Sequence, residues 1–264
     1  MNKFTKLFLI ILILFFGLLI ILYHRYKDKT FILTYHIVDE YQGGYKGLTV
    51  RPKTLDRQMK YLYNRGYKTI PLSELVQILK DKKEIPTKKF VLTFDDGYEN
   101  FYKNALPILR KYGFTATVFI TAGNIGKVCS YPHCPPEKHL SKEQIKEISE
   151  FVDIGAHSVK HPDLTKISKE EVYIEAMESK NLLEKIIKKP VKIFCYPFGN
   201  YSEEVKSIIK ETGFIGACST ERGLVDKNSD TYSLPRYEFK EFYALSPSDF
   251  LSSIDFYLKI FLGL

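Results

Sequence analysis

The sequence predicts an α/β fold, in which alternating strands and helices build a parallel sheet behind one N-terminal apolar helix. Three observations lead to this prediction. The 264 residues are 45% hydrophobic and 27% charged, an ordinary globular composition that excludes a disordered or collagen-like chain. From residue 31 onward, short β-branched or aromatic runs alternate with helical patterns, as in βα units. Residues 1–30 instead contain a long uncharged stretch.

The N-terminal stretch is predicted to anchor the chain in a membrane. Leu7 to Tyr23 is uncharged and almost wholly apolar, and it reaches the lower length limit for crossing a bilayer core, about 17 residues. No small-residue cleavage site follows it, so we expect an uncleaved, single-pass helix. The basic residues on its two sides nearly balance, and charge alone therefore leaves its orientation open.

The net charge of +8 does not indicate a nucleic-acid partner. Five of the 39 basic residues and one of the 31 acidic residues lie in the first 30 positions. The remainder holds 34 basic and 30 acidic residues, which is a mixed surface rather than a basic footprint.

Residues 1–30 are interpreted as a cytoplasmic stub, membrane anchor and basic linker, and residues 31–264 as one folded domain. No internal repeat or Gly/Ser linker divides the second part. Several of its predicted strands are nearly continuous apolar runs, typical of strands buried on both faces. The eight predicted strands are residues 31–38, 67–70, 90–94, 115–120, 152–156, 192–196, 214–218 and 233–239.

Helix starts are marked by local capping signals. Ser141 with Gln144 and Ser168 with Glu171 match the capping box, in which both side chains bond to backbone N–H groups of the first turn. A third helix is predicted from an apolar stripe at helical spacing, and a fourth begins where Ser precedes Pro near the C-terminus. These are the stripe Leu55, Met59 and Leu62, and the pair Ser246 and Pro247.

The final stretch, residues 250–264, has a helical pattern that is unusually apolar toward its end. Two interpretations stay open. The helix either closes the core or makes a second contact with the membrane surface.

Four cysteines are too few to define a disulfide scaffold. Cys129 and Cys134 flank a Pro-rich loop, and in an exported protein they either form a disulfide or stay as two thiols. Their spacing matches no common zinc-ligand pattern. Cys195 and Cys218 lie in apolar runs and are expected to be buried.

Polar residues gather where three predicted strands end. Asp95 and Asp96 follow the strand 90–94, and His157 and His161 follow the strand 152–156. In α/β folds this end of the sheet carries the active site. One Asp with two His residues makes a facial metal site that leaves positions for water and substrate.

The third strand end is the segment Tyr196-Pro197-Phe198-Gly199, where a strand leaves through Pro and Gly into a helix. This segment is either an ordinary βα turn or a turn whose free backbone N–H groups receive a developing oxyanion.

The segments TFDDG, HSVKHPDL and YPFG, in this order, resemble the motifs of the NodB-homology polysaccharide deacetylases, carbohydrate esterase family 4. The resemblance extends over roughly residues 31–239. It implies a distorted (β/α) barrel of about seven or eight strands and metal-dependent N-deacetylation of a sugar polymer.

The resemblance also implies roles for individual residues. Asp95 matches the catalytic base, and Asp96, His157 and His161 match the metal ligands. The expected ion is Zn²⁺, with Co²⁺ or Ni²⁺ as alternatives, since such an ion polarises the amide carbonyl and acidifies bound water. The backbone N–H of Phe198 falls at the family's oxyanion position.

Two departures from the family pattern concern the base and the acid. Cys195 stands where the family has an Arg, and Arg236 resembles the residue that a subgroup with YPFG uses instead to orient the base. The usual C-terminal Leu-x-His acid is missing, because no histidine follows His161. We expect His36, at the end of the first strand, to act as the acid, an order that resembles the permuted biofilm poly-N-acetylglucosamine deacetylases.

Two aromatic residues near the motifs are candidates for substrate contact. Tyr98 and Tyr201 border the predicted site and either stack on sugar rings or belong to the core. His24, His133 and His139 are expected to be surface or loop residues.

The leading hypothesis is a membrane-anchored enzyme with an extracytoplasmic catalytic domain that deacetylates an N-acetylglucosamine polymer of the poly-N-acetylglucosamine type. Peptidoglycan or a lipid-linked sugar is the alternative substrate, and a non-catalytic carbohydrate-binding protein on the same fold is the alternative class. Adjacent Asp95 and Asp96 do not match an aspartyl phosphatase, whose two acids are one residue apart. Protein partners and oligomeric state are not predicted.

Overall fold

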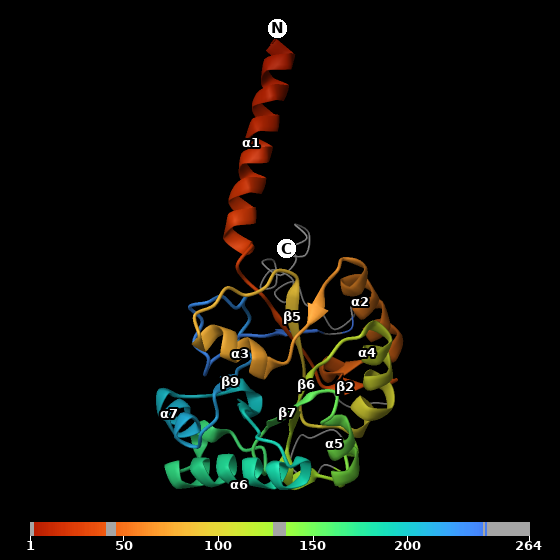
Figure 1. Cartoon of the computed structure of the whole chain (residues 1–264), viewed down its shortest axis with the longest axis vertical. Helices are drawn as coiled ribbons and strands as arrows, with labels where there is room; N and C mark the ends of the chain where they lie inside the picture. Colours follow the sequence, from red (N-terminus) through yellow and green to blue (C-terminus); the bar gives the residue numbers. More distant parts are fainter. Residues whose placement is uncertain (1–2, 41–45, 129–135, 240, 242–264) are drawn as a thin grey trace.

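The computed structural model describes residues 3–40, 46–128, 136–239 and 241 (Figure 1). The chain begins with helix α1 (Lys3–Tyr26), which projects from the rest of the molecule and is long and apolar enough to cross a membrane. Its apolar side chains are exposed, but Tyr26 at its end is 2% exposed and packs into the folded domain. The joint between helix and domain is therefore a packed contact.

The core of the domain is one curled parallel sheet. Its strands follow the order β10-β1-β5-β6-β7-β8-β9, and β4 pairs with the start of β5. The predicted parallel sheet is confirmed. The strands are β1 (Ile32–Tyr35), β4 (Lys68–Thr69), β5 (Lys89–Phe94), β6 (Thr117–Ile120), β7 (Asp153–Ala156), β8 (Ile193–Cys195), β9 (Gly216–Cys218) and β10 (Tyr237–Glu238).

The two edges of the sheet approach each other. Cys218 of β9 forms a parallel bridge with Leu234, three residues before β10 begins. Ser219 N–H donates to the Leu234 carbonyl at 3.0 Å, and Arg236 N–H donates to the Glu221 carbonyl at 2.7 Å. The segment before β10 therefore closes the sheet into the expected distorted barrel.

The predicted strand 31–38 is divided. β1 ends at Tyr35, and β2 (Ile37–Val38) leaves the main sheet to pair with β3 (Thr49–Val50). His36 lies at the break between them. The sequence did not predict β3, because two residues are too short for a visible pattern.

Six helices follow α1 among the described residues, and short turns of other helical types connect the elements. Both predicted capping boxes are confirmed, because Ser141 and Ser168 each accept from the N3 backbone and their N3 partners bond back. The helices are α2 (Pro52–Asn64), α3 (Leu72–Lys80), α4 (Leu106–Tyr112), α5 (Lys142–Ile148), α6 (Lys169–Ile187) and α7 (Glu203–Glu211). The short turns are η1 (Lys46–Leu48), η2 (Phe101–Ala105), η3 (Ala122–Asn124), η4 (Leu164–Lys166) and η5 (Pro197–Gly199).

Buried side chains of the strands alternate between two apolar clusters, as the two-residue period of a strand requires. Leu33, Leu92 and Phe194 pack in the larger cluster with residues of α2, α4, α5, α6 and α7. Their neighbours Ile32 and Val91 belong to the smaller cluster, which includes the apolar face of α3. The second set faces the inside of the curled sheet.

The inward face becomes polar toward the ends of the strands. In β1 the residues at two-residue steps are Ile32, Thr34 and then His36, and in β5 they are Val91, Thr93 and then Asp95. The two strands are paired in the register Ile32 with Val91 and Thr34 with Thr93. The same parity that packs the core therefore places His36 and Asp95 together at one end of the barrel.

Several sequence predictions fall outside the described residues. These are the Cys129 and Cys134 pairing, the loop residue His133, and the helix predicted over residues 246–264. Cys195 and Cys218 are both buried and free, as expected.

Candidate active site

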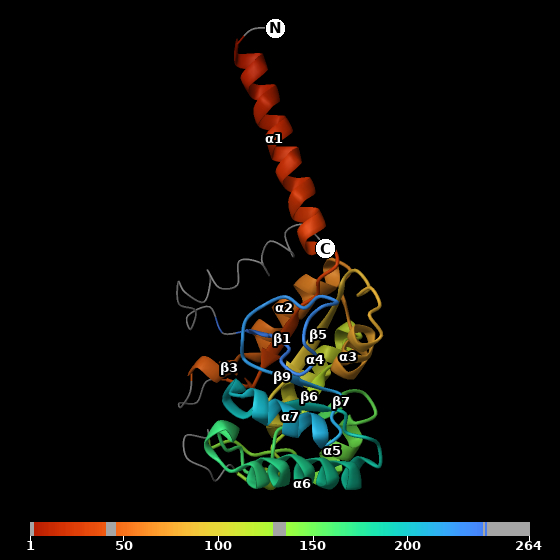
Figure 2. The same ribbon diagram turned by 90° about the vertical axis from the view of Figure 1, so that its left-hand side faces the viewer.

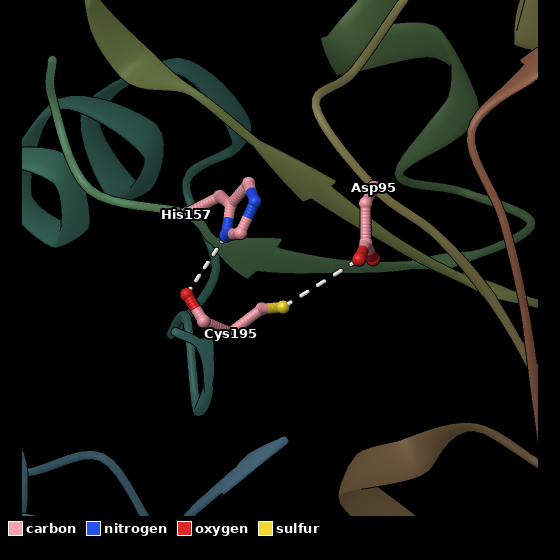
Figure 3. A group of neighbouring side chains, drawn as sticks. All are labelled: Asp95, His157 and Cys195. Carbon is pink, nitrogen blue, oxygen red and sulfur yellow. Dashed lines mark hydrogen bonds between the residues drawn. The ribbon is translucent and has the colours of Figure 1, made fainter. Parts of the chain in front are cut away.

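The predicted site residues meet where the parallel strands end. Asp95 and Asp96 follow β5, His157 follows β7, and His36 follows β1. Figure 3 shows Cys195, at the end of β8, between Asp95 and His157. This end of a parallel barrel is where active sites are built, because the loops that follow the strands converge there.

Asp96, His157 and His161 form a compact ligand set. The Nε2 atoms of His157 and His161 are 3.1 Å apart, and Asp96 Oδ1 lies 3.5 Å and 3.6 Å from them. Tetrahedral ligands at the bond lengths usual for zinc are separated by about 3.3 to 3.4 Å. The three residues therefore fit a divalent ion of the size of Zn²⁺.

Unusual backbone conformations position these ligands. Asp96 (φ 68°) and His161 (φ 58°) both have left-handed conformations, which cost energy in non-glycine residues. Gly97, next to Asp96, has φ 75°, and a Cβ there would lie 2.7 Å from the Ile120 side chain. The tight turn after β5 thus requires glycine and aims the Asp96 carboxylate at the histidines.

The protonation of the two histidines suits metal binding. His157 Nδ1 lies 2.8 Å from the Cys195 carbonyl oxygen, so this nitrogen carries the proton and donates (Figure 3). The other ring nitrogen, Nε2, faces His161 and Asp96. Burial lowers the pKa of His157 to about 4, with a contribution from His161, and burial likewise lowers the pKa of His161 to about 4. Both imidazoles are neutral at pH 7, the state that binds a metal.

The turn between the two histidines is held by Glu175, a residue that the sequence analysis missed. Its Oε2 accepts the Val159 and Lys160 N–H groups at 2.7 Å and 2.8 Å, and it is buried on α6. Ser158 Oγ accepts the His161 N–H at 2.9 Å. Nothing local in the sequence distinguishes Glu175 from the other glutamates of α6.

Asp95 is paired with Arg236. The guanidinium Nη1 and Nη2 donate to the two carboxylate oxygens at 2.8 Å each, and both side chains are almost fully buried. Nη1 also donates to Thr34 and Thr93 hydroxyls at 2.8 Å and 3.1 Å. The structure thus places Arg236 on the predicted base.

This environment keeps Asp95 ionised. Burial alone raises the pKa of the Asp95 carboxyl, but the opposing charge and hydrogen bonds of Arg236 outweigh burial and hold the pKa well below its ordinary value. The carboxylate is therefore available as a proton acceptor throughout the neutral range, with its orientation fixed by a two-point contact.

A second set of ligand-type atoms, from Asp95, His157 and Cys195, lies within 4.8 Å. It does not suit a metal ion. Arg236 occupies both Asp95 oxygens and lies 3.2 Å from Cys195 Sγ, so a cation already fills this place. Burial raises the pKa of the Cys195 thiol far above its ordinary value, and the thiol stays protonated. Of the two sets, the one that could hold a metal ion is Asp96, His157 and His161.

His36 lies on the open side of Asp95. Its Nε2 is 3.8 Å from Asp95 Oδ2, and its Nδ1 is 3.9 Å from Glu238 Oε1. The side chain is 16% exposed, so it borders both the base and solvent. The position next to Asp95 is the one that the two-residue parity of β1 and β5 predicts.

The turn after β8 brings Phe198 to the ligand set. Phe198 has φ 59°, and its ring packs edge-on against His161 with centroids 4.6 Å apart. Its side chain is 55% exposed. Gly199 closes the turn with φ 74°, and a Cβ there would lie 2.0 Å from the Thr220 hydroxyl, so only glycine fits.

Burial distinguishes between the two interpretations of Tyr98 and contradicts a surface position for His139. Tyr98 is 1% exposed, so the core interpretation holds for it and its ring offers no face to a sugar. His139, expected on the surface or in a loop, is also 1% exposed, and its ring lies 4.8 Å from that of Tyr98. The reason is a strand-like segment, in which His139 bridges to Tyr98 and Leu140 N–H donates to the Gly97 carbonyl.

Tyr201 borders a polar groove of 540 Å³ that starts at the turn of Phe198. Its hydroxyl donates to Glu221 Oε1 at 3.2 Å, and its ring stacks on Tyr196 at 5.1 Å. The groove is lined by residues 199–203 together with Thr220, Glu221 and Thr165.

A family model and a curated relative both match this chain, and both are polysaccharide deacetylases by name. The family model "Polysaccharide deacetylase" matches residues 82–217. The chain is 34% identical to YxkH of Bacillus subtilis, whose name places it among the polysaccharide deacetylases, over 78% of this chain and 69% of that protein.

Two further relatives extend the comparison. The poly-β-1,6-N-acetyl-D-glucosamine N-deacetylase of Staphylococcus aureus is 28% identical over 81% of this chain and 76% of its own length. The structure of the Streptococcus pyogenes deacetylase PplD in complex with acetate superposes with a TM-score of 0.72 at 26% identity, over 84% of this chain and 96% of that chain. Sequence and fold thus point to the same family.

Proposed function

Because the chain belongs to the polysaccharide deacetylase family, we propose that it is a metal-dependent hydrolase that removes N-acetyl groups from N-acetylglucosamine residues of a cell-surface or extracellular polysaccharide. The observation that carries this proposal is the ligand set Asp96, His157 and His161 beside the Asp95–Arg236 pair. Similarity to the staphylococcal enzyme supports poly-N-acetylglucosamine as the polymer.

The first step of the proposed reaction is the attack of water on the acetyl group. A divalent ion on Asp96, His157 and His161, with Zn²⁺ preferred, would supply Lewis acidity to the acetyl carbonyl and lower the pKa of the attacking water. Asp95 accepts a proton from that water as it attacks the acetyl carbon. Arg236 keeps Asp95 ionised and fixes its orientation.

The remaining steps concern the oxyanion and the leaving group. The backbone N–H of Phe198, at the turn beside His161, donates to the developing oxyanion. His36 protonates the amine nitrogen as the carbon–nitrogen bond breaks, which releases acetate and a free glucosamine amine. Its place beside Asp95, at the open side of the barrel, supports this role.

Membrane attachment through α1 and an extracytoplasmic catalytic domain complete the proposal, since the polymer is outside the cell. The groove beside Tyr201 is the proposed place for neighbouring sugars of the chain, with Tyr201 on its wall. Tyr98 has no part in this contact, because it is buried.

The test is acetate release from poly-N-acetylglucosamine oligomers by the full chain in detergent, with and without a chelator. Asp95→Asn and His36→Gln are compared with Glu178→Gln, an exposed glutamate of α6 that serves as the control. We expect release that requires metal and both site residues and is unaffected by the control.

Each other outcome changes a defined part of the proposal. Acetate release from peptidoglycan or a lipid-linked acetylated sugar, and not from the oligomers, would change the proposed substrate but leave the proposed reaction unchanged. An active His36→Gln variant removes His36 from the acid role. Polymer binding without release from any of these substrates, with metal bound, supports the carbohydrate-binding alternative.

A further inference from the structure

A strongly basic surface lies where α1 joins the domain. It comprises residues at the end of α1 and the start of β1, at the end of α2 and in β4, in the α3–β5 loop, and in the segment after Val225. We call it the basal face. In both views the α3–β5 loop, residues 81–88, lies beside the lower end of α1 (Figures 1 and 2). Its ten basic residues are Arg25, Lys27, Lys29, Arg65, Lys68, Lys82, Lys83, Lys88, Lys89 and Lys227, and its four acidic residues are Asp28, Asp81, Glu84 and Asp226.

Backbone and side-chain contacts make this face one continuous surface. Thr30 forms an antiparallel bridge with Val225, which joins the linker after α1 to the segment before Lys227. Lys82 Nζ donates to the Lys227 carbonyl at 3.3 Å, and Lys88 Nζ donates to the Arg65 carbonyl at 3.0 Å. The loops that carry the lysines therefore hold one another in place beside the helix.

Most of these charges lack an ionic partner within the part of the chain that the structure describes. Seven of the ten basic side chains make no ion pair with a described carboxylate. They are Arg25, Arg65, Lys68, Lys82, Lys88, Lys89 and Lys227. The ion pairs of Lys27 and Lys29 are 4.0 Å long, at the limit for such contacts. The face as a whole is thus an uncompensated cationic surface.

Two of the lysines are neighbours across a pair of strands. Lys68 of β4 and Lys89 of β5 are direct partners in the parallel register, and like charges opposite each other on paired strands are unfavourable. Both border an open hollow of 700 Å³, together with Tyr63 and Tyr112. An anion in this hollow would relieve the repulsion between the two lysines.

We propose that the basal face lies on the membrane that α1 crosses and binds anionic lipid headgroups, with one headgroup phosphate in the hollow between Lys68 and Lys89. The proposal rests on α1 being the membrane anchor of the proposed function. Exposed Tyr61 (45%) and Tyr63 (53%) on α2 belong to the same region, and tyrosines favour the interfacial layer of a bilayer. Headgroup binding leaves the active site uncovered, because β5 runs from Lys89 in this face to Phe94 beside Asp95.

The experiment measures how fast the native lysines of the full chain react with an acetylating reagent, residue by residue, by mass spectrometry. The chain is placed in nanodiscs of phosphatidylcholine alone or with about one-third phosphatidylglycerol, a content at which anionic surfaces attract basic residues. We expect Lys68, Lys82 and Lys88 to be acetylated several-fold more slowly in nanodiscs that contain the anionic lipid. In 0.5 M salt the Debye length is only about 4 Å, so salt should remove most of this difference. Lys169 and Lys185 of α6, far from α1, are the internal controls and should not change (Figure 1).

The opposing outcomes are distinct. Equal protection in neutral and anionic nanodiscs, or protection of the α6 lysines as well, overturns the proposal, because mere proximity would then explain it. The same lysines are also measured in detergent with inorganic phosphate. If phosphate slows their reaction as much as the anionic lipid does, the face is a site for soluble anions and not a membrane surface.

A matched pair of variants tests the hollow. With phosphatidylglycerol present, the thermal midpoint of the chain should rise in the wild type and in the control K169Q/K185Q, and this rise should be lost in K68Q/K89Q. A rise that persists in K68Q/K89Q removes the hollow from the proposal. Acetate release in the same nanodiscs is recorded in parallel, so activity without headgroup protection would reject this inference and leave the proposed function intact.

Discussion

The two halves of the candidate site are built in different ways. The metal half, Asp96 with His157 and His161, depends on tight turns whose residues have left-handed conformations. The base half, Asp95 with Arg236, depends on a buried ion pair between residues 141 positions apart in the sequence. Local backbone geometry holds the first half, and closure of the barrel holds the second.

The two halves should therefore respond differently to the loss of a contact. Several hydrogen bonds hold the turn between His157 and His161, so removal of one of them should disturb the turn only in part. A buried ion pair does not tolerate such a loss, since removal of one partner leaves the other charged and buried without compensation. Cys195 touches both halves, with its carbonyl on His157 and its thiol 3.7 Å from Asp95 (Figure 3).

The sharpest separation of the two halves comes from adjacent substitutions. Asp95→Asn should lower kcat by about 100-fold to 10,000-fold, the usual contribution of a general base, while the protein keeps its metal. Asp96→Ala should remove the metal as well as the activity. Metal analysis and acetate release on the same samples check both predictions. Loss of metal from Asp95→Asn would show that the two halves are not independent.

Arg236→Met should destabilise the chain by about 3–5 kcal/mol, because Asp95 is left buried without its partner. Urea unfolding in detergent, without metal, measures this change. The double variant with Asp95→Asn is the control and should recover most of the loss, since it removes the unpaired charge. If the double variant is as unstable as the single one, packing of the Arg236 side chain is responsible instead.

Glu175→Gln should weaken metal binding by about 10-fold to 100-fold, the typical effect of a residue that orients metal ligands. The amide keeps an acceptor for one oxygen position but loses the charge that holds both the Val159 and Lys160 N–H groups. Competition with a zinc-sensitive dye measures affinity, and Glu178→Gln on the exposed side of α6 is the matched control. Unchanged metal affinity would show that Ser158 and the backbone hold the turn between the two histidines without Glu175.

As the pH falls, the stability that the metal half contributes should be lost before that of the base half. The pKa values of His157 and His161 are lowered by burial to about 4, below the ordinary value near 6.5, so the unfolded chain binds more protons between these limits. Stability of the metal-free chain is therefore lost as the pH falls from about 6.5 toward 4. The base half contributes until the pH falls below about 4, because the pKa of Asp95 is lowered.

Urea midpoints of the chelated chain across this range check the order. A His157→Gln, His161→Gln variant should flatten the change above pH 4 and leave the steeper loss below it. A variant that titrates like the wild type above pH 4 would show that other groups cause the first loss.

The metal half could be predicted from the sequence more fully than the base half. The strands and the turns at Asp96 and His161 have short-range signals, such as apolar runs, Gly97 and the spacing of the two histidines. Arg236 was expected at the base from a family resemblance, but Thr34 and Thr93, which position its guanidinium, have no signal until the register of β1 and β5 is known.

Other residues were missed for similar reasons. Glu175 approaches the metal half only because α6 packs beside the turn, and no local pattern marks it. His139 was expected on the surface or in a loop, and it lies outside the named helices and strands, but its bridge to Tyr98 accompanies its burial. Propensity describes the segment alone, whereas burial depends on which segments pair across the fold.

The closing segment of the barrel has a consequence for biosynthesis. Arg236 lies just before β10, the last described strand, so it leaves the ribosome after all the metal ligands and after Asp95. A nascent chain that has emerged only through β9 contains all the residues of the metal half, but its carboxylate at Asp95 has no guanidinium partner. In the order of synthesis, the side chain that pairs with Asp95 is therefore the last part of the two halves to become available.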